Sequence, residues 1–168
     1  MSGREWFVWT DGSCKAAEGA PGGWGYHARS PRGEVLEGFG KAVSTLAKIM
    51  EYRAVAEALA ALPEDVRVTV YSDNQSLIEN LTKRLRDWRA NRFANVDETV
   101  VDSVRRIDAS IAEKRLVVTW QWLRGHHGNV GNERADALAA QGAREAKADL
   151  EAARRDRDAA RNPRRPRR

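Results

Sequence analysis

With 168 residues, the chain is long enough for one domain with a full hydrophobic core and too short for two comfortable ones. Hydrophobic residues make up 42% and charged residues 32%, and no apolar run approaches the roughly 18 residues that a membrane span needs. This composition excludes a membrane-spanning protein. The single cysteine, Cys14, excludes an internal disulfide, and no apolar signal segment precedes residue 6, so we expect a cytoplasmic protein.

Positive charge is concentrated at the C-terminal end. From Arg144 onward ten Lys or Arg residues stand against five Asp or Glu, whereas the preceding residues carry nineteen of each kind. A neutral body with a basic end favours a phosphate-rich partner, because Lys and Arg contacts release condensed counterions from phosphates. The alternative is a solvated end that only aids solubility. We divide the chain into a domain over residues 1–143 and a basic, Arg-rich tail over residues 144–168, partly helical or disordered.

The first third of the chain predicts an antiparallel three-stranded meander followed by a helix. Strands are expected near residues 5–10, 24–30 and 34–42, with turn residues at Gly22-Gly23 and Pro31-Arg32-Gly33. Residues 45–62 carry apolar side chains at helical spacing and stop at a proline. We expect Ser44 or Thr45 to cap this helix.

The rest of the chain alternates between strands and helices. Residues 66–72 and 116–123 predict strands, residues 73–88 and 95–113 predict helices, and Asn132 is expected to cap a last helix that runs to about residue 143 or beyond. The resulting order, βββαβααβα, predicts an α/β fold with a five-stranded mixed sheet flanked by helices. The first three strands are antiparallel, and the first and fourth can lie parallel at the centre.

Carboxylates occur at unusual places in this pattern. Asp11 directly follows the first apolar strand, and Asp73 directly follows the fourth, so both are expected at one edge of the sheet, on strands about 4.8 Å apart. This edge is where open α/β sheets usually bind ligands. Glu51 lies beside the inward stripe of its helix, where an unpaired carboxylate is costly. Asp136 falls in the first turns of the last helix.

Each of these acids has an ordinary explanation when taken alone. An Asp after a strand often forms a turn or a helix cap, and an acid early in a helix complements the helix dipole. The four together favour a site for a hard cation, since carboxylate oxygens suit Mg²⁺ or Mn²⁺. The sequence has no Cys and His spacing typical of a zinc site.

Five fragments, in their order and spacing, together resemble type 1 ribonuclease H, and the resemblance spans residues 6–143. They are Thr10-Asp11-Gly12-Ser13-Cys14, Gly22-Gly23-Trp24-Gly25, Met50-Glu51, Ser72-Asp73-Asn74-Gln75, and Gly125-His126 with Asn132-Glu133-Arg134-Ala135-Asp136. The resemblance implies the ribonuclease H-like fold for residues 1–143. It also implies an endonuclease that hydrolyses the RNA strand of RNA/DNA hybrids.

The resemblance further implies two-metal catalysis by the four carboxylates Asp11, Glu51, Asp73 and Asp136. Two Mg²⁺ ions, for which Mn²⁺ can substitute, would activate the attacking water and stabilise the leaving 3′ oxygen, leaving 5′-phosphate and 3′-hydroxyl ends. Asp11 would bridge both ions. His126 matches the family histidine that assists proton transfer or product departure. His127 beside it is the alternative, but alignment to the preceding glycine favours His126.

Substrate-binding residues also follow from the resemblance. Gly12, Ser13, Cys14 and Gln75 are candidates for the surface that reads 2′-hydroxyls in the minor groove. For Cys14 the alternative is a small buried hydrophobe. Lys48 stands where the family often has an Asn-Asn-Arg element, and it could serve as a phosphate contact.

A basic stretch after the fourth strand corresponds to the protrusion that grips DNA in some family members. Trp88 and Arg89 are its candidate contacts, although such a cluster is otherwise an ordinary solvated helix face. His27, inside the second strand, is expected to be a satisfied or exposed strand residue.

The expected partner is an RNA/DNA hybrid, with no protein partner evident and a monomeric state. The first strand begins within about five residues of the start, so we expect no separate N-terminal hybrid-binding domain. One competing hypothesis keeps the fold but assigns another nucleic acid, as in a junction resolvase or a DNA nuclease. Another is an inactive nucleic-acid-binding module, but clustered negative charge does not help a protein bind polyanions.

Overall fold

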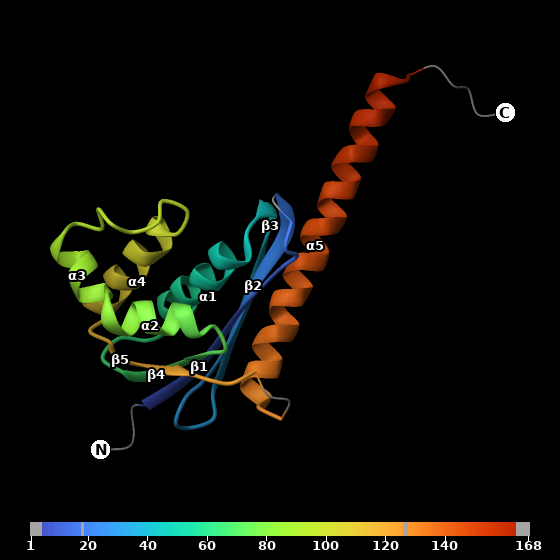
Figure 1. Ribbon diagram of the computed structural model, residues 1–168. Coiled ribbons are helices and arrows are strands. Elements are labelled where there is room, and N and C mark those ends of the chain that lie inside the picture. Colours follow the sequence, from blue (N-terminus) through green and yellow to red (C-terminus); the bar gives the residue numbers. More distant parts are fainter. Residues whose placement is uncertain (1–4, 18, 126–127, 164–168) are drawn as a thin grey trace.

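A five-stranded mixed sheet forms the centre of the computed structural model, which describes residues 5–17, 19–125 and 128–163 (Figure 1). The strand order is β3-β2-β1-β4-β5. β1 pairs antiparallel with β2, and β2 with β3, whereas β1–β4 and β4–β5 are parallel pairs. The predicted sheet is therefore confirmed. The strands are β1 (Glu5–Cys14), β2 (Ala20–Arg29), β3 (Val35–Thr45), β4 (Arg67–Ser72) and β5 (Val117–Trp122).

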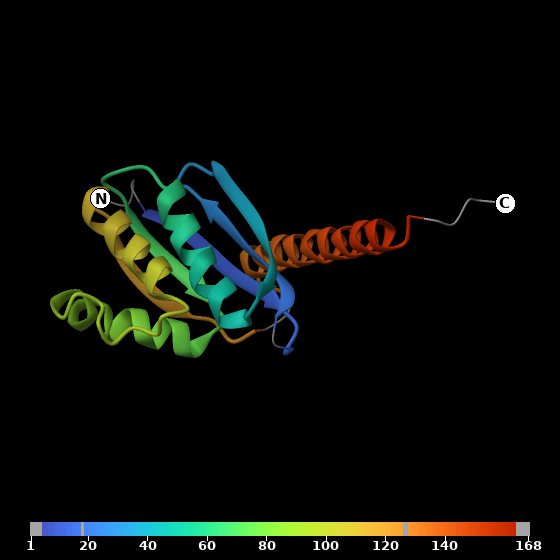
Figure 2. The ribbon, with the colours of Figure 1, turned by 90° about the horizontal axis from the view of Figure 1, so that it is seen from above.

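Helices cover both faces of this sheet. α1 and α4 lie over one face, and α5 crosses the opposite face, where it packs mainly on β2, β1 and β3 (Figure 2). α2 and α3 follow β4 at the side of the sheet (Figure 1). The helices are α1 (Ala47–Ala61), α2 (Gln75–Lys83), α3 (Leu85–Ala90), α4 (Val101–Glu113) and α5 (Val130–Arg161).

The main hydrophobic core lies between the sheet and α1 with α4. Val8 of β1 and Val70 of β4 point into it and meet Val55 and Leu59 of α1 and Ile107 of α4, all of them fully buried. The alternation of valines in β4 and the helical spacing in α1 therefore have the packing role that the sequence predicted. This layer fixes α1 against β1, which matters for the site described below.

Glycines let α5 pack unusually close to the other face of the sheet. A Cβ added to Gly25 would lie 2.6 Å from the backbone nitrogen of Ala139, and one added to Gly142 would clash with the carbonyl oxygen of Gly40. Gly23 would clash with α5 in the same way. Because no real Cβ is tolerated at such distances, these positions need glycine for the close approach of backbone to backbone.

Several predicted boundaries were wrong near the first turn and the first helix. Gly22 and Gly23 lie inside β2, and the chain reverses instead between Cys14 and Ala20. α1 has no side-chain cap, because Leu46 occupies its N-cap position. The expected caps, Ser44 and Thr45, are the last residues of β3.

Two later helices also begin at other residues than predicted. α4 begins at Val101 rather than 95, because residues 97–100 form a turn in which the Asp97 carboxylate accepts hydrogen bonds from the backbone and hydroxyl of Thr99. α5 begins at Val130. Its cap is Asn129, whose side chain accepts a hydrogen bond from the backbone nitrogen of Asn132, so Asn132 lies inside the helix.

α5 is one continuous helix of 32 residues and about 48 Å, and it projects well beyond the sheet (Figure 1). It includes residues 144–161 and ends just before Pro163, which is consistent with the helix-breaking role expected for proline. The division of the chain at residue 143 stays a prediction, since no structural break marks it. Among the described residues, no helix is long and apolar enough to cross a membrane.

Candidate active site

The register of the parallel strands brings Asp11 and Asp73 together. Trp9 of β1 pairs with Tyr71 of β4, so two residues further along each strand Asp11 comes level with Asp73. Asp11 does not follow β1, as the sequence suggested, but lies inside it, paired with Gly25 of β2. Asp11 is buried and Asp73, just past the end of β4, is exposed. The expected meeting of two carboxylates at one sheet edge is therefore confirmed.

Gly12 lets the first turn of α1 bring Glu51 to this edge. A Cβ on Gly12 would lie 2.6 Å from the backbone nitrogen of Glu51 and 2.9 Å from the carbonyl carbon of Met50. The backbone nitrogen of Gly12 also donates a 2.9 Å hydrogen bond to Oδ1 of Asp11. Glu51 is only 8% exposed, as its place beside the inward stripe of α1 predicted.

Gly25 likewise allows the helix that carries the fourth carboxylate, Asp136, to approach Asp11. It is the β2 partner of Asp11, and its missing side chain lets Ala135 and Ala139 of α5 rest directly on the strand. Asp136 follows Ala135, and its negative charge acts on Asp11. The two helices that carry Glu51 and Asp136 thus approach Asp11 from opposite faces of the sheet.

The described carboxylates form a tight cluster. One oxygen each from Asp11, Glu51 and Asp73 all lie within 4.8 Å of one another. Burial, and then the negative charges of Glu51, Asp73 and Asp136, raise the pKa of Asp11 to about 9. Burial and the charge of Asp73 raise the pKa of Glu51 to about 8, and burial followed by Asp136 raises the pKa of Asp73. This site therefore disfavours its own ionised form.

A divalent cation fits this arrangement. Oε2 of Glu51 is buried and has no hydrogen-bond partner among the described residues, which is costly for a polar atom unless a cation satisfies it. The donor set is made of oxygens alone, which hard cations such as Mg²⁺ and Mn²⁺ prefer. Asp11, Glu51 and Asp73 would hold the ion, with Asp136 beside them.

Three predicted substrate residues continue β1 beyond the cluster. Gly12, Ser13 and Cys14 are half-buried at the end of the strand. The sulfur of Cys14 lies 3.8 Å from the carbonyl oxygen of Ala20 and 3.6 Å from that of Thr45, and burial raises its pKa. A protonated thiol between carbonyl groups is not a nucleophile.

The remaining predicted residues are more dispersed. Gln75 is exposed at the start of α2 and hydrogen-bonds Glu79, and Lys48 is exposed at the start of α1 and pairs with Asp97 at 2.9 Å. Arg89 is exposed but pairs with Asp108 at 2.7 Å. The other predicted residue of α3, Trp88, is a core residue at 8% exposure, so its indole is not offered to a ligand surface.

Of the three histidines in the sequence, His27 alone lies among the described residues. The predicted catalytic histidine, His126, and its neighbour His127 lie outside the described residues. His27 pairs with Glu37 across β2 and β3 at 2.8 Å, which confirms that it is a satisfied strand residue. Arg134 contacts the same Glu37 at 2.7 Å and fixes the beginning of α5 on β3.

Comparison with known proteins identifies the family. The family model for RNase H matches residues 3–144. The chain belongs to the ribonuclease H family of endoribonucleases. It is 41% identical over 138 residues to the ribonuclease H of Polaromonas naphthalenivorans, covering 80% of this chain and 84% of that one. It is 39% identical over 143 residues to the ribonuclease H of Bordetella pertussis, covering 83% and 90%.

Solved structures share the fold. LC9-RNase H1, described as a type 1 RNase H with the type 2 active-site motif, superposes with a TM-score of 0.69 at 24% identity, covering 83% of this chain and 72% of that one. The N-terminal RNase H domain of rv2228c from Mycobacterium tuberculosis gives a TM-score of 0.67 at 17% identity, covering 87% and 98%. The expected ribonuclease H-like fold is therefore confirmed.

Sequence reasoning missed the role of the glycines in β2. Gly23 and Gly25 were interpreted as part of a family motif, and Gly22-Gly23 as a turn. Their spacing of two residues in a strand was the available signal, since alternate residues point to one face and a glycine inside a strand marks close backbone approach. That face is the one that α5 covers.

Proposed function

We propose that the protein hydrolyses the RNA strand of RNA/DNA hybrids with two divalent cations, leaving 5′-phosphate and 3′-hydroxyl ends. The observation that carries this proposal is the convergence of Asp11, Glu51 and Asp73 within 4.8 Å, with Asp136 beside them, in a chain of the ribonuclease H family. A cluster of acids next to a polyanionic substrate is unfavourable for a simple binding protein and requires cations.

Bound cations would supply a nucleophilic water at neutral pH and stabilise charge on the leaving oxygen. The residues of this chain hold the site in place for that chemistry. Asp11 is fixed by the backbone nitrogen of Gly12 and by its position inside β1, and Glu51 is fixed by the packing of α1. Asp73 and Asp136 are more exposed and close the cluster from the solvent side.

Selection of the RNA strand is proposed to come from the residues that flank the cluster. Gly12 and Ser13 are half-buried at the end of β1, and Gln75 is exposed at the start of α2, where they could meet 2′-hydroxyls in a minor groove. Lys48 and Arg89 are proposed phosphate contacts that would exchange their present carboxylate partners for the substrate. His126 is proposed to move a proton during product departure.

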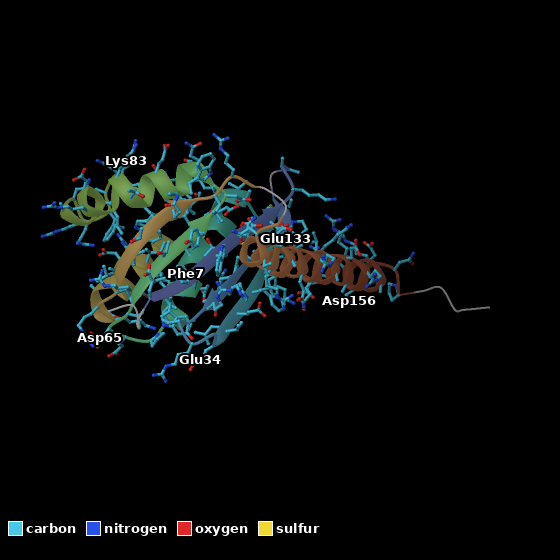
Figure 3. All side chains as sticks on the ribbon, turned by 90° about the horizontal axis from the view of Figure 1, so that it is seen from below. Phe7, Glu34, Asp65, Lys83, Glu133 and Asp156 are labelled. Carbon is cyan, nitrogen blue, oxygen red and sulfur yellow. The ribbon has the colours of Figure 1, made fainter. Side chains whose placement is uncertain are left out.

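A strand-labelled hybrid tests the proposal. We expect Mg²⁺-dependent loss of the RNA strand alone, no cleavage in EDTA, and none by the Asp11→Asn variant. Glu34→Gln is a matched control, because Glu34 is an exposed acid between β2 and β3 whose neutralisation should leave cleavage unchanged (Figure 3). End analysis of the products should give 5′-phosphates.

Matched double-stranded RNA and double-stranded DNA complete the test. Cleavage of DNA in preference to the hybrid would assign another substrate to the same fold. Tight hybrid binding without cleavage in either Mg²⁺ or Mn²⁺ would contradict the enzymatic proposal and leave a binding module.

A further inference from the structure

A groove runs between α5 and the connection from β1 to β2. It encloses about 580 Å³ and we call it the hairpin groove. Its floor is made of small or apolar side chains, and its rim carries four exposed cations and one exposed acid, Glu151. The floor residues are Ser13, Cys14, Gly19, Ala20, Pro21, Ala140, Ala143 and Leu150, and the rim cations are Lys15, Arg144, Lys147 and Arg154.

The hairpin groove lies in line with the carboxylate cluster. Along α5, residues 136, 140, 143, 147, 150 and 154 recur every three or four positions and therefore share one face of the helix. At 1.5 Å per residue, Lys147 lies about 16 Å and Arg154 about 27 Å from Asp136 along the helix axis. On the other wall, Ser13 and Cys14 directly follow the strand segment that holds Asp11.

The charges of α5 are sorted between its two sides. Asp149 pairs with Lys41 of β3 at 2.8 Å, and Glu145 acts on the same lysine. These acids therefore face β3, while Arg144, Lys147 and Arg154 face the hairpin groove. The part of α5 over residues 144–161 carries nearly equal numbers of positive and negative side chains, but the side that faces the groove is positive.

We propose that the hairpin groove binds the sugar-phosphate backbone of the hybrid next to the scissile phosphate. This inference rests on the proposed function and extends it to substrate length. Phosphates are the ligands that a row of exposed Lys and Arg side chains recognises, and small floor residues let a backbone approach closely. The distance to Arg154 corresponds to about eight nucleotide steps at roughly 3.4 Å each.

A second copy of this chain is a poorer partner for the exposed part of α5 than a nucleic-acid backbone. Helix pairing requires a continuous apolar seam, and among residues 147–161 Leu150 is the sole large apolar side chain. The basic side chains around Lys83 on α2 lie at the opposite end of the molecule from the projecting part of α5 (Figure 3). The hairpin groove would therefore extend the nucleic-acid contact to a new side of the carboxylate cluster.

Hybrid binding by charge variants of α5 tests this inference. The full chain is titrated in EDTA, where no cation supports cleavage, with hybrids of about 8 and about 24 base pairs, and affinity is read by fluorescence anisotropy. Lys147→Gln and Arg154→Gln each remove one groove cation. Arg155→Gln is the matched control, because Arg155 is exposed on the same helix but is not among the groove residues named above.

We expect each groove variant to weaken binding of the long hybrid about threefold and to reduce the salt slope by about one, with a smaller loss for the short hybrid. The control should match the wild type. Equal losses for Arg155→Gln and Arg154→Gln would overturn the proposal, since they would indicate diffuse charge attraction, and so would unchanged affinity. Cleavage of the short hybrid in Mg²⁺ is measured in parallel, so that failure of the proposed function is seen separately.

Discussion

The carboxylate cluster and the contact between α5 and the sheet lie side by side, yet they have opposite energetic character. In the cluster, buried acids repel one another and one oxygen of Glu51 lacks a partner among the described residues. In the contact, Gly25 and Gly142 let backbones meet without voids. The fold therefore tolerates a locally unfavourable site because the helix beside it is held by dense packing.

The largest expected effect comes from neutralising the centre of the cluster. Asp11→Asn should lower kcat by about a thousandfold or more, because it removes the central carboxylate of the proposed cation site. The same variant should raise the free energy of unfolding of the metal-free protein by about 2 kcal/mol near neutral pH, since asparagine is neutral and folds without the proton uptake that burying Asp11 requires. Steady-state cleavage and chemical denaturation in EDTA measure the two effects. If the metal-free variant is less stable than the wild type, the carboxylate cluster does not destabilise the fold as described above.

Filling the glycine contact should have the next largest effect, and on stability. Gly142→Val places a branched side chain against the backbone of β3 and should lower the free energy of unfolding by about 3 kcal/mol. Ala159→Val, on the exposed end of the same helix, is the control and should cost less than about 1 kcal/mol. Urea denaturation of both variants measures the two changes in the free energy of unfolding. Similar losses at the two positions would show that helix propensity and not packing matters.

The cluster also predicts an unusual dependence of stability on pH. Asp11 and Glu51 have pKa values of about 9 and about 8 in the metal-free fold, above their ordinary values of 3.8 and 4.5. The folded protein therefore keeps protons that the unfolded chain releases. In EDTA the free energy of unfolding should fall as pH rises from about 4 to about 9, by at most about 1.4 kcal/mol per pH unit for each group.

Saturating Mg²⁺ should reverse this loss, because the ion binds only the folded cluster. Thermal denaturation across this pH range, with and without the ion, measures the effect. The Asp11→Asn variant should show a shallower slope, and a slope equal to that of the wild type would indicate that other groups control the pH dependence.

The smallest expected effect concerns the ion pair that ties α5 to β3. Lys41 and Asp149 are 43% and 51% exposed, so Lys41→Gln should lower the free energy of unfolding only slightly at low salt. The loss should disappear in high salt, where an exposed pair is screened. A loss of several kcal/mol would place this pair, and not the glycine contact, at the centre of the α5 attachment.

The sheet and the carboxylates were predictable because each left a strong local pattern. Alternating valines identified β4, and the helical stripe of α1 placed Glu51 on the inward side. The end of β1 was not predictable from the same signal. Its apolar run stops at Thr10, but the strand continues to Cys14 because backbone pairing with β2 extends it.

Side-chain hydrogen bonds account for other errors. Val96 continues the apolar spacing of α4, yet the Asp97 carboxylate captures Thr99 and holds the chain in a turn. Asn129 and Asn132 are equally suitable caps in sequence, and only the fold selects the first. The burial of Trp88 could not be read from its basic neighbours, because a helix can bury one side chain among several exposed ones.

The continuity of α5 connects the carboxylate cluster to a distant surface. Asp136 and Arg161 lie on one unbroken helix, about 38 Å apart along its axis. Ala135, Ala139 and Gly142 hold the first half of this helix on the sheet. A molecule bound near Arg161 would therefore stand at a fixed distance and direction from Asp136, a proposed metal ligand.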